Sequence, residues 1–302
     1  MRIIVAGGSG FLGRALVDAC RSGGHEVTVL TRRPRGAGDV QWAPTARSGA
    51  IVDVLEHADA VVNLAGEGIA DRRWTDERKT AILESRVTPT RTLADAILAC
   101  SSPPAVFLSA SGVGFYGARD GELKTENSPQ GDDFLAKVCS TWEAEATRAA
   151  TATRVVLLRT GLVLARNGGA LPRMALPFHF FVGGRIGSGR QYMSWIHIDD
   201  WVAMVRWALQ VDRVSGPLNV TAPSPVTNSE FSRALARSMR RPALLPVPSF
   251  ALHLVLGAEM ADTLLLGGQR AVPQKAQDLG CRYRYTTADA ALDAIYEDLT
   301  RG

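Results

Sequence analysis

The chain has 302 residues, of which 46% are hydrophobic, and carries a formal net charge of +4 at pH 7. This length suits one large α/β domain, or a domain with an additional lobe. Because the basic excess is dispersed arginine rather than a Lys/Arg block, we expect no nucleic-acid partner. The longest apolar stretch, residues 250–256, is far shorter than the roughly 20 residues of a membrane-spanning helix, so we also expect no membrane partner.

The four cysteines indicate the redox environment. Cys20, Cys100, Cys139 and Cys281 lie far apart and lack Cys-x-x-Cys spacing, so we predict neither a metal site nor disulfides. This usage fits a reducing compartment. Because residues 3–6 already form the first predicted strand, the start of the chain leaves no room for a signal peptide. We therefore expect a cytoplasmic protein.

A dinucleotide-binding pattern opens the chain. Residues 3–6 form a short apolar run that is typical of a buried parallel strand, and a helical periodicity follows directly over residues 11–21. Glycines between strand and helix allow a tight turn, close approach of a pyrophosphate and close helix packing. The first N–H groups of the helix can then bind the phosphates. The predicted first part of the cofactor site comprises Gly7, Gly10, Phe11, Leu12 and Gly13.

The end of the second strand indicates which dinucleotide is bound. An NAD site places a carboxylate there to bind the ribose 2′-hydroxyl. Strand 26–30 is instead followed by Thr31, Arg32 and Arg33. Arginine binds phosphate oxygens through its planar guanidinium, so these residues favour the 2′-phosphate of NADP(H). The alternative is that both arginines are solvated turn residues.

Strand and helix patterns continue to alternate along the chain. Helices are predicted over 51–57, 75–99 and 133–149, and strands over 60–65, 106–111 and 154–159, with residues 34–49 irregular. Such βαβ alternation predicts a Rossmann-type doubly wound parallel sheet. After Gly161 the chain becomes rich in glycine, proline and aromatic residues. We expect residues 1–160, with 199–220 returning to them, to form the cofactor domain, and residues 161–198 and 221–302 to form a smaller, discontinuous substrate lobe.

The helices and strands predicted after residue 198 have weaker hydrophobic patterns. Helix 199–209 has Asp199 as a plausible N-cap, and helix 230–239 has Thr227 or Asn228. A short strand is predicted over 217–220, an apolar helix over 250–256 and a final helix over 287–299.

Several short motifs follow one another along the chain, among them Asn63-Leu-Ala-Gly66, Ser109-Ala-Ser111 with Tyr116-Gly117, and Trp195-Ile-His197. With these, the chain resembles atypical extended short-chain dehydrogenases/reductases of the "epimerase family", described as NAD(P)-dependent nucleoside-diphosphate-sugar epimerases. Residues 267–273 fit the C-terminal extension of that family. The resemblance implies that cofactor contacts also come from Leu64, Ala65, Gly66, Arg86 and Ser109. The alternative for Arg86 is a surface ion pair with Glu84 or Glu77.

The resemblance also implies a catalytic pair that this chain lacks. Ordinary members use a tyrosine and a lysine four residues apart, in which the lysine lowers the pKa of the tyrosine. Helix 133–149 contains no tyrosine. One register places Leu135 and Cys139 at the two positions, and another places Lys137 and Thr141 there. Neither restores the pair.

The remaining catalytic candidates are Ser111 and Tyr116. Ser111 ends the strand at which the family serine binds a substrate carbonyl or hydroxyl, and Tyr116 could serve as a substitute acid. The alternatives are that Ser111 caps a turn and that Tyr116 shapes a loop. We expect Cys139 to be a buried filler. We expect Glu143 to pair with Lys137 or Arg148 on the helix surface.

A glycine-rich loop supplies candidate substrate contacts. Together with Ser111, the predicted substrate-binding residues are Arg190, Tyr192, Trp195 and His197, with a general-base role possible for His197. Arg72, Arg73 and Trp74 could form the other wall. Two functions follow from these predictions: an NADP(H)-dependent oxidoreductase or epimerase with a small-molecule substrate, or a catalytically silent NADP(H)-binding regulatory or scaffolding protein. The sequence indicates no oligomeric state.

Overall fold

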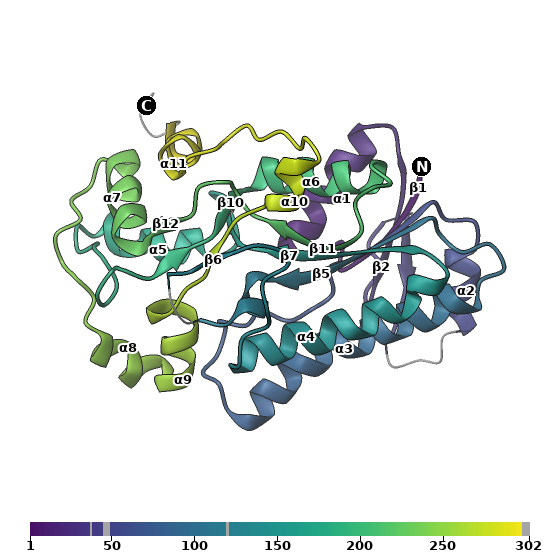
Figure 1. The fold of residues 1–302 in the computed structure, drawn as a ribbon, viewed down its shortest axis with the longest axis horizontal. Coiled ribbons are helices and arrows are strands. Elements are labelled where there is room, and N and C mark those ends of the chain that lie inside the picture. Colours follow the sequence, from purple (N-terminus) through teal and green to yellow (C-terminus); the bar gives the residue numbers. More distant parts are fainter. Residues whose placement is uncertain (37, 45–48, 119–120, 298–302) are drawn as a thin grey trace.

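A seven-stranded parallel sheet forms the centre of the computed structural model, which describes residues 1–36, 38–44, 49–118 and 121–297 (Figure 1). Its strand order is β3-β2-β1-β4-β5-β7-β11, and each neighbouring pair is parallel. This is the doubly wound arrangement that the alternation of apolar runs predicted, so the fold class is confirmed. The strands are β1 (Arg2–Ala6), β2 (Glu26–Thr31), β3 (Asp39–Gln41), β4 (Ala60–Asn63), β5 (Val106–Gly112), β7 (Arg154–Thr160) and β11 (Gly216–Val220).

Helices cover both faces of the sheet. On one face, α1 (Phe11–Ser22) packs against α6 (Ile198–Gln210), and on the other α3 (Asp76–Ala99) packs against α2 (Gly49–Leu55) and α4 (Phe134–Thr147) (Figure 1). A separate hydrophobic core fills each interface. Because the sheet is buried on both sides, its strands are continuous apolar runs rather than alternating ones.

A third hydrophobic core lies among α5 (Leu171–His179), α7 (Asn228–Met239) and α11 (Ala288–Tyr296). Outside the central sheet, short strands pair as β8 (Leu162–Leu164) with β10 (Trp195–His197), β9 (Tyr192–Met193) with β12 (Val226–Thr227), and β6 (Leu123–Lys124) with β13 (Arg270–Ala271). Further helices are α8 (Ser249–Leu256), α9 (Ala258–Ala261) and α10 (Gln274–Asp278). Short 3-10 or π turns are η1 (Val113–Tyr116), η2 (Arg148–Thr151) and η3 (Asp262–Leu266).

Several local predictions were wrong or incomplete. Residues 34–49 were expected to be irregular but contain β3, because its backbone pairs with β2. Asp199 does not cap α6: the ring Nδ1 of His197 accepts the backbone N–H of Asp199 at 3.1 Å. Thr227 caps α7 in a capping box with Glu230. The last residues of the predicted helix 287–299 fall outside the described part.

Within the described residues, no helix is both long and apolar enough to cross a bilayer.

Candidate functional site

The turn between β1 and α1 is compact on one side and open on the other. Gly7 has φ +78°, and a Cβ there would lie 2.7 Å from the backbone of Leu64. A Cβ on Gly13 would lie 2.2 Å from the carbonyl oxygen of Gly7. Ser9 and Gly10, at the tip, are exposed. The glycines therefore let three backbone segments meet while leaving the start of α1 accessible to a phosphate.

Gly13→Ala is expected to open this turn, because the new methyl group would overlap backbone atoms that have nowhere to move. We expect the free energy of unfolding to fall by about 1–3 kcal/mol and the affinity for NADPH to fall at least about tenfold. Urea unfolding and fluorescence titration measure these effects. Gly36→Ala is the control, since a Cβ at Gly36 meets no atom within 4 Å. Equal behaviour of the two variants would contradict this account of the turn.

The loop after β4 faces the glycine turn across the ends of the strands. Leu64 and Ala65 are half-buried and Gly66 is exposed. Asn63 holds the loop: its Oδ1 accepts the N–H of Ala65 at 3.1 Å, and its Nδ2 donates to Thr90 Oγ1 at 2.7 Å. The segment that was predicted to border the cofactor is thus fixed by a buried amide.

The end of β2 presents cations and no carboxylate. Arg32 and Arg33 are exposed, and no ion pair involving either is found in the described part of the chain. Thr31 is half-buried, and its Oγ1 accepts the N–H of Arg33 at 3.3 Å. Both guanidinium groups therefore remain available to an anionic ligand.

Arg86 reaches the loop after β4 from α3. Its Nη2 donates to the carbonyl of Glu67 at 2.8 Å, and its Nη1 donates to Ile82 at 2.9 Å. A Cβ on Gly66 would lie 3.3 Å from its Cζ, so the guanidinium lies against the loop after β4. Burial lowers the pKa of Arg86. These contacts replace the surface ion pair with Glu84 or Glu77 that was the alternative.

Ser111 is held by a buried ion pair. Its Oγ donates to Glu143 Oε1 at 2.6 Å, and Arg159 donates to both oxygens of Glu143 at 2.8 Å. The side chains of Arg159 and Glu143 are only 4% and 8% exposed. The predicted surface pairing of Glu143 with Lys137 or Arg148 is therefore wrong. The physical reason is that this face of α4 turns toward β5 and β7.

Tyr116 belongs to the same network. Its hydroxyl donates to Asn219 Oδ1 at 2.6 Å and accepts from Arg159 Nη1 at 3.1 Å. The backbone N–H of Asn219 in turn donates to Glu126 Oε1 at 3.0 Å. Burial raises the pKa of Tyr116. Because both partners of the hydroxyl are internal, the structure favours the alternative in which Tyr116 shapes the loop.

The two registers for the missing pair differ in burial. Leu135 and Cys139 are both buried, and a Cβ on Gly114 would lie 3.8 Å from Cys139 Sγ. Burial raises the pKa of Cys139 to about 11, so the thiol is neutral at pH 7. Lys137 and Thr141, in the other register, are exposed. Cys139 is a buried filler, as predicted, and no lysine of the described part of the chain is hydrogen-bonded to Ser111.

The four substrate candidates from the glycine-rich loop lie in different surroundings. Arg190 is exposed, whereas Tyr192 is half-buried with Arg270 Cζ 4.8 Å from its ring centroid. Trp195 is fully buried and donates to the carbonyl of Ser224 at 3.0 Å. His197 is buried and caps α6, and burial lowers its pKa. These side chains therefore do not form one continuous wall.

Of the residues predicted to form the other wall of the substrate site, Trp74 packs against a neighbouring ring. The rings of Trp74 and Phe134 meet edge to face with centroids 5.0 Å apart, while Arg72 and Arg73 are exposed. Ser109, also predicted to contact the cofactor, is fully buried, and its hydroxyl has no hydrogen-bond partner among the described residues.

Sequence reasoning missed Arg159, Asn219 and Glu126. A signal was present for Arg159, because a charged residue occurs at the end of the otherwise apolar run of β7. No comparable signal marks Asn219 or Glu126. These two residues are hydrogen-bonded to each other but lie 93 residues apart in the chain.

A doubly wound sheet with a glycine turn and a basic end to β2 defines a dinucleotide-binding protein of the short-chain dehydrogenase/reductase class. Residues 3–220 match the model of the NAD dependent epimerase/dehydratase family, and residues 247–295 match a domain of unknown function, DUF1731. The chain belongs to this epimerase family, as its motifs predicted.

Related proteins extend over the whole chain. An epimerase family protein of Mycobacterium leprae is 43% identical over 293 residues, which are 96% of this chain and 94% of the relative. The human epimerase family protein SDR39U1 is 40% identical, with 98% of this chain and 99% of the relative covered. A crystal structure of human SDR39U1 (isoform 2) with NADPH aligns with a TM-score of 0.91 at 38% identity, over 99% of this chain and 100% of that one.

Proposed function

We propose that the chain binds NADP(H) across the ends of β1, β2 and β4. The observation that carries the proposal is the end of β2, where Arg32 and Arg33 are exposed and no carboxylate follows the strand. The guanidinium groups would hold the 2′-phosphate, and the start of α1 would hold the pyrophosphate. The NADPH in the similar human structure supports this choice over NAD(H).

We further propose that the protein is an oxidoreductase or epimerase acting on a small hydroxyl or carbonyl compound in the cytoplasm. NADP(H), when bound, supplies or accepts the hydride. Because the proton of Ser111 is donated to Glu143, the remaining lone pairs of the serine oxygen are free to accept a hydrogen bond from a substrate hydroxyl. Ser111 would thus orient the substrate, with Arg190 and Tyr192 as further contacts.

One observation favours the second function, an NADP(H)-binding protein without turnover. One register puts Leu135 and the neutral thiol of Cys139 at the two catalytic positions, and the other puts Lys137 and Thr141 there, so neither register supplies a tyrosine–lysine pair.

A turnover assay distinguishes the two functions. The purified protein is mixed with NADPH and a panel of aldehydes, ketones and keto-sugar nucleotides, and NADPH loss is followed by absorbance. We expect consumption with at least one compound and a fall of about tenfold or more for Ser111→Ala, since one substrate hydrogen bond is lost. Ser101→Ala, at an exposed position just beyond the C-terminal end of α3, is the matched control. NADPH binding without consumption of any compound would favour the silent protein.

A further inference from the structure

One end of the C-terminal lobe exposes an unusual number of large apolar side chains. Helix α8 has no buried residue, and Phe250 and Leu254 on it are 72% and 78% exposed. Figure 1 places α8 and α5 at the same end of the molecule. We define the apolar end surface as Leu176, Phe180, Phe181, Val182, Leu244, Leu245, Phe250, Leu254 and Val255, all at least 48% exposed.

Backbone hydrogen bonds join the parts of this surface. The N–H of Leu245 donates to the carbonyl of Gly183 at 3.2 Å, and that of Val247 donates to Arg185 at 2.8 Å. The segment after α5 and the segment before α8 therefore lie side by side. Clustered exposed apolar side chains of this kind mark interaction sites in soluble folds. With eight residues, α8 is about 12 Å long, so it can lie on a bilayer but cannot cross it.

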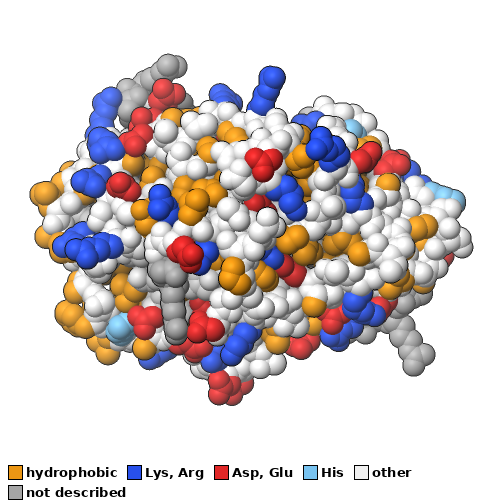
Figure 2. All heavy atoms as spheres, viewed as in Figure 1, with side chains coloured by type: hydrophobic (Ala, Val, Ile, Leu, Met, Phe, Trp, Pro, Cys, Tyr) orange, Lys and Arg blue, Asp and Glu red, His pale blue; other side chains and the backbone are white. Residues whose placement is uncertain are grey.

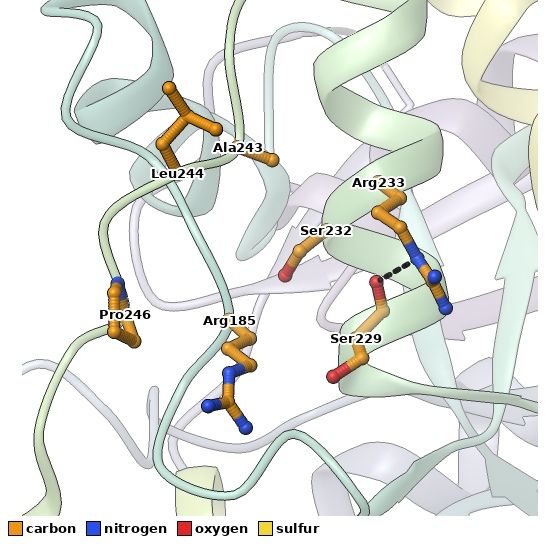
Figure 3. Close-up of a pocket in the computed structure, with 7 residues that line it drawn as sticks. All are labelled: Arg185, Ser229, Ser232, Arg233, Ala243, Leu244 and Pro246. Carbon is orange, nitrogen blue, oxygen red and sulfur yellow. Dashed lines mark hydrogen bonds between the residues drawn. The ribbon is translucent and has the colours of Figure 1, made fainter.

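Arginines accompany the apolar side chains. The guanidinium of Arg241 lies 4.6 Å from the ring centroid of Phe181. Arg185 and Arg233 line a hollow of about 330 Å³ whose other walls include two serines, Leu244 and Pro246 (Figure 3). Arg233 Nε donates to the Ser229 carbonyl at 3.3 Å, which leaves its terminal nitrogens for a ligand. No carboxylate lines this hollow.

Two nearby carboxylates already form ion pairs with side chains of the protein. Asp262 pairs with His253 at 2.7 Å, and Glu259 pairs with Lys79 at 2.9 Å. Hydrophobic and basic groups accordingly occur together at the left end of the space-filling view in Figure 2. The apolar end surface thus combines insertable side chains with cations that complement negative charge.

We propose that the apolar end surface docks this protein onto a bilayer containing anionic phospholipids, with a headgroup phosphate in the hollow beside Arg185 and Arg233. Phe250 and Leu254 enter the boundary between headgroups and acyl chains, and the arginines bind the phosphates above it. This peripheral mode departs from the expectation of no membrane partner, which rested only on the lack of an apolar stretch long enough to span a bilayer. A second copy fits less well, because a two-fold interface would place these arginines against their own counterparts.

Vesicle co-sedimentation tests the proposal with the full chain. Vesicles of phosphatidylcholine alone are compared with vesicles containing one part phosphatidylglycerol to two parts phosphatidylcholine. We expect sedimentation with the anionic vesicles, weakened as salt is raised because screening shortens the electrostatic range. Phe250→Ser/Leu254→Ser and Arg185→Ala/Arg233→Ala should each weaken partitioning about tenfold or more. Both pairs are exposed, so the fold should persist, and circular dichroism checks it.

Matched controls come from the same molecule. Leu98→Ser lies on α3, away from the apolar end surface, and Arg237→Ala lies one turn beyond Arg233 but pairs with Asp289. Both should partition like the unaltered protein. The proposal is overturned if anionic vesicles do not sediment the protein, or if the surface variants behave like the controls. It is also overturned if sedimentation velocity shows a dimer that Phe250→Ser/Leu254→Ser dissociates, since a second copy would then cover the surface.

Discussion

Glu143→Gln is expected to lower the free energy of unfolding by about 3–5 kcal/mol, because it breaks a buried ion pair. The substitution removes the carboxylate charge that compensates the buried guanidinium of Arg159 and leaves that cation with neutral partners such as the Tyr116 hydroxyl. It also weakens the hydrogen bond that the Ser111 hydroxyl donates to this side chain. Urea unfolding at neutral pH measures the loss.

Glu145→Gln is the matched control on the same helix. Glu145 pairs with Arg91, which is half exposed, and with Arg148 on the surface, so its loss should cost no more than about 1 kcal/mol. If the two variants lose similar free energies of unfolding, the buried ion pair does not stabilise the protein more than the surface pairs do. Replacing Glu143 and Arg159 together by apolar residues should cost less than either single change, because no buried charge then remains unpaired.

Arg32→Ala/Arg33→Ala is expected to weaken NADPH binding by roughly tenfold to a hundredfold, the loss of one or two charge-assisted hydrogen bonds. NADH has no 2′-phosphate, so its affinity should change little. Isothermal titration with both cofactors gives the two dissociation constants.

Arg35→Ala controls for general loss of positive charge, because Arg35 is exposed in the same loop while its backbone N–H donates to Asp39. We expect its NADPH/NADH affinity ratio to match that of the unaltered protein. If the double variant also keeps that ratio, the arginines do not bind the 2′-phosphate.

Local patterns were enough to predict the cofactor side of the fold. A strand, a glycine turn and a helix depend on neighbouring residues, so the positions of Gly7 and Gly13 could be inferred from spacing alone. The parallel order of the sheet followed from the alternation of elements, because crossovers between parallel strands have a preferred hand.

The chemistry beside Ser111 could not be predicted in the same way. Whether Glu143 meets Lys137 on the helix surface or Arg159 in the interior depends on how α4 is rotated against β7, which is a tertiary property. The burial of Trp195 likewise depends on the third core rather than on the glycines that precede it. His197 was recognised as a candidate, but its position at the start of α6 gives its ring a capping role.

Cofactor preference is the central claim, and a titration of the unaltered protein tests it most directly. NADPH and NADH are titrated separately against the same preparation, and their dissociation constants are compared. The exposed arginines after β2 predict that NADPH binds at least about tenfold more tightly than NADH. Equal affinities, tighter binding of NADH, or no binding of either cofactor would contradict the account.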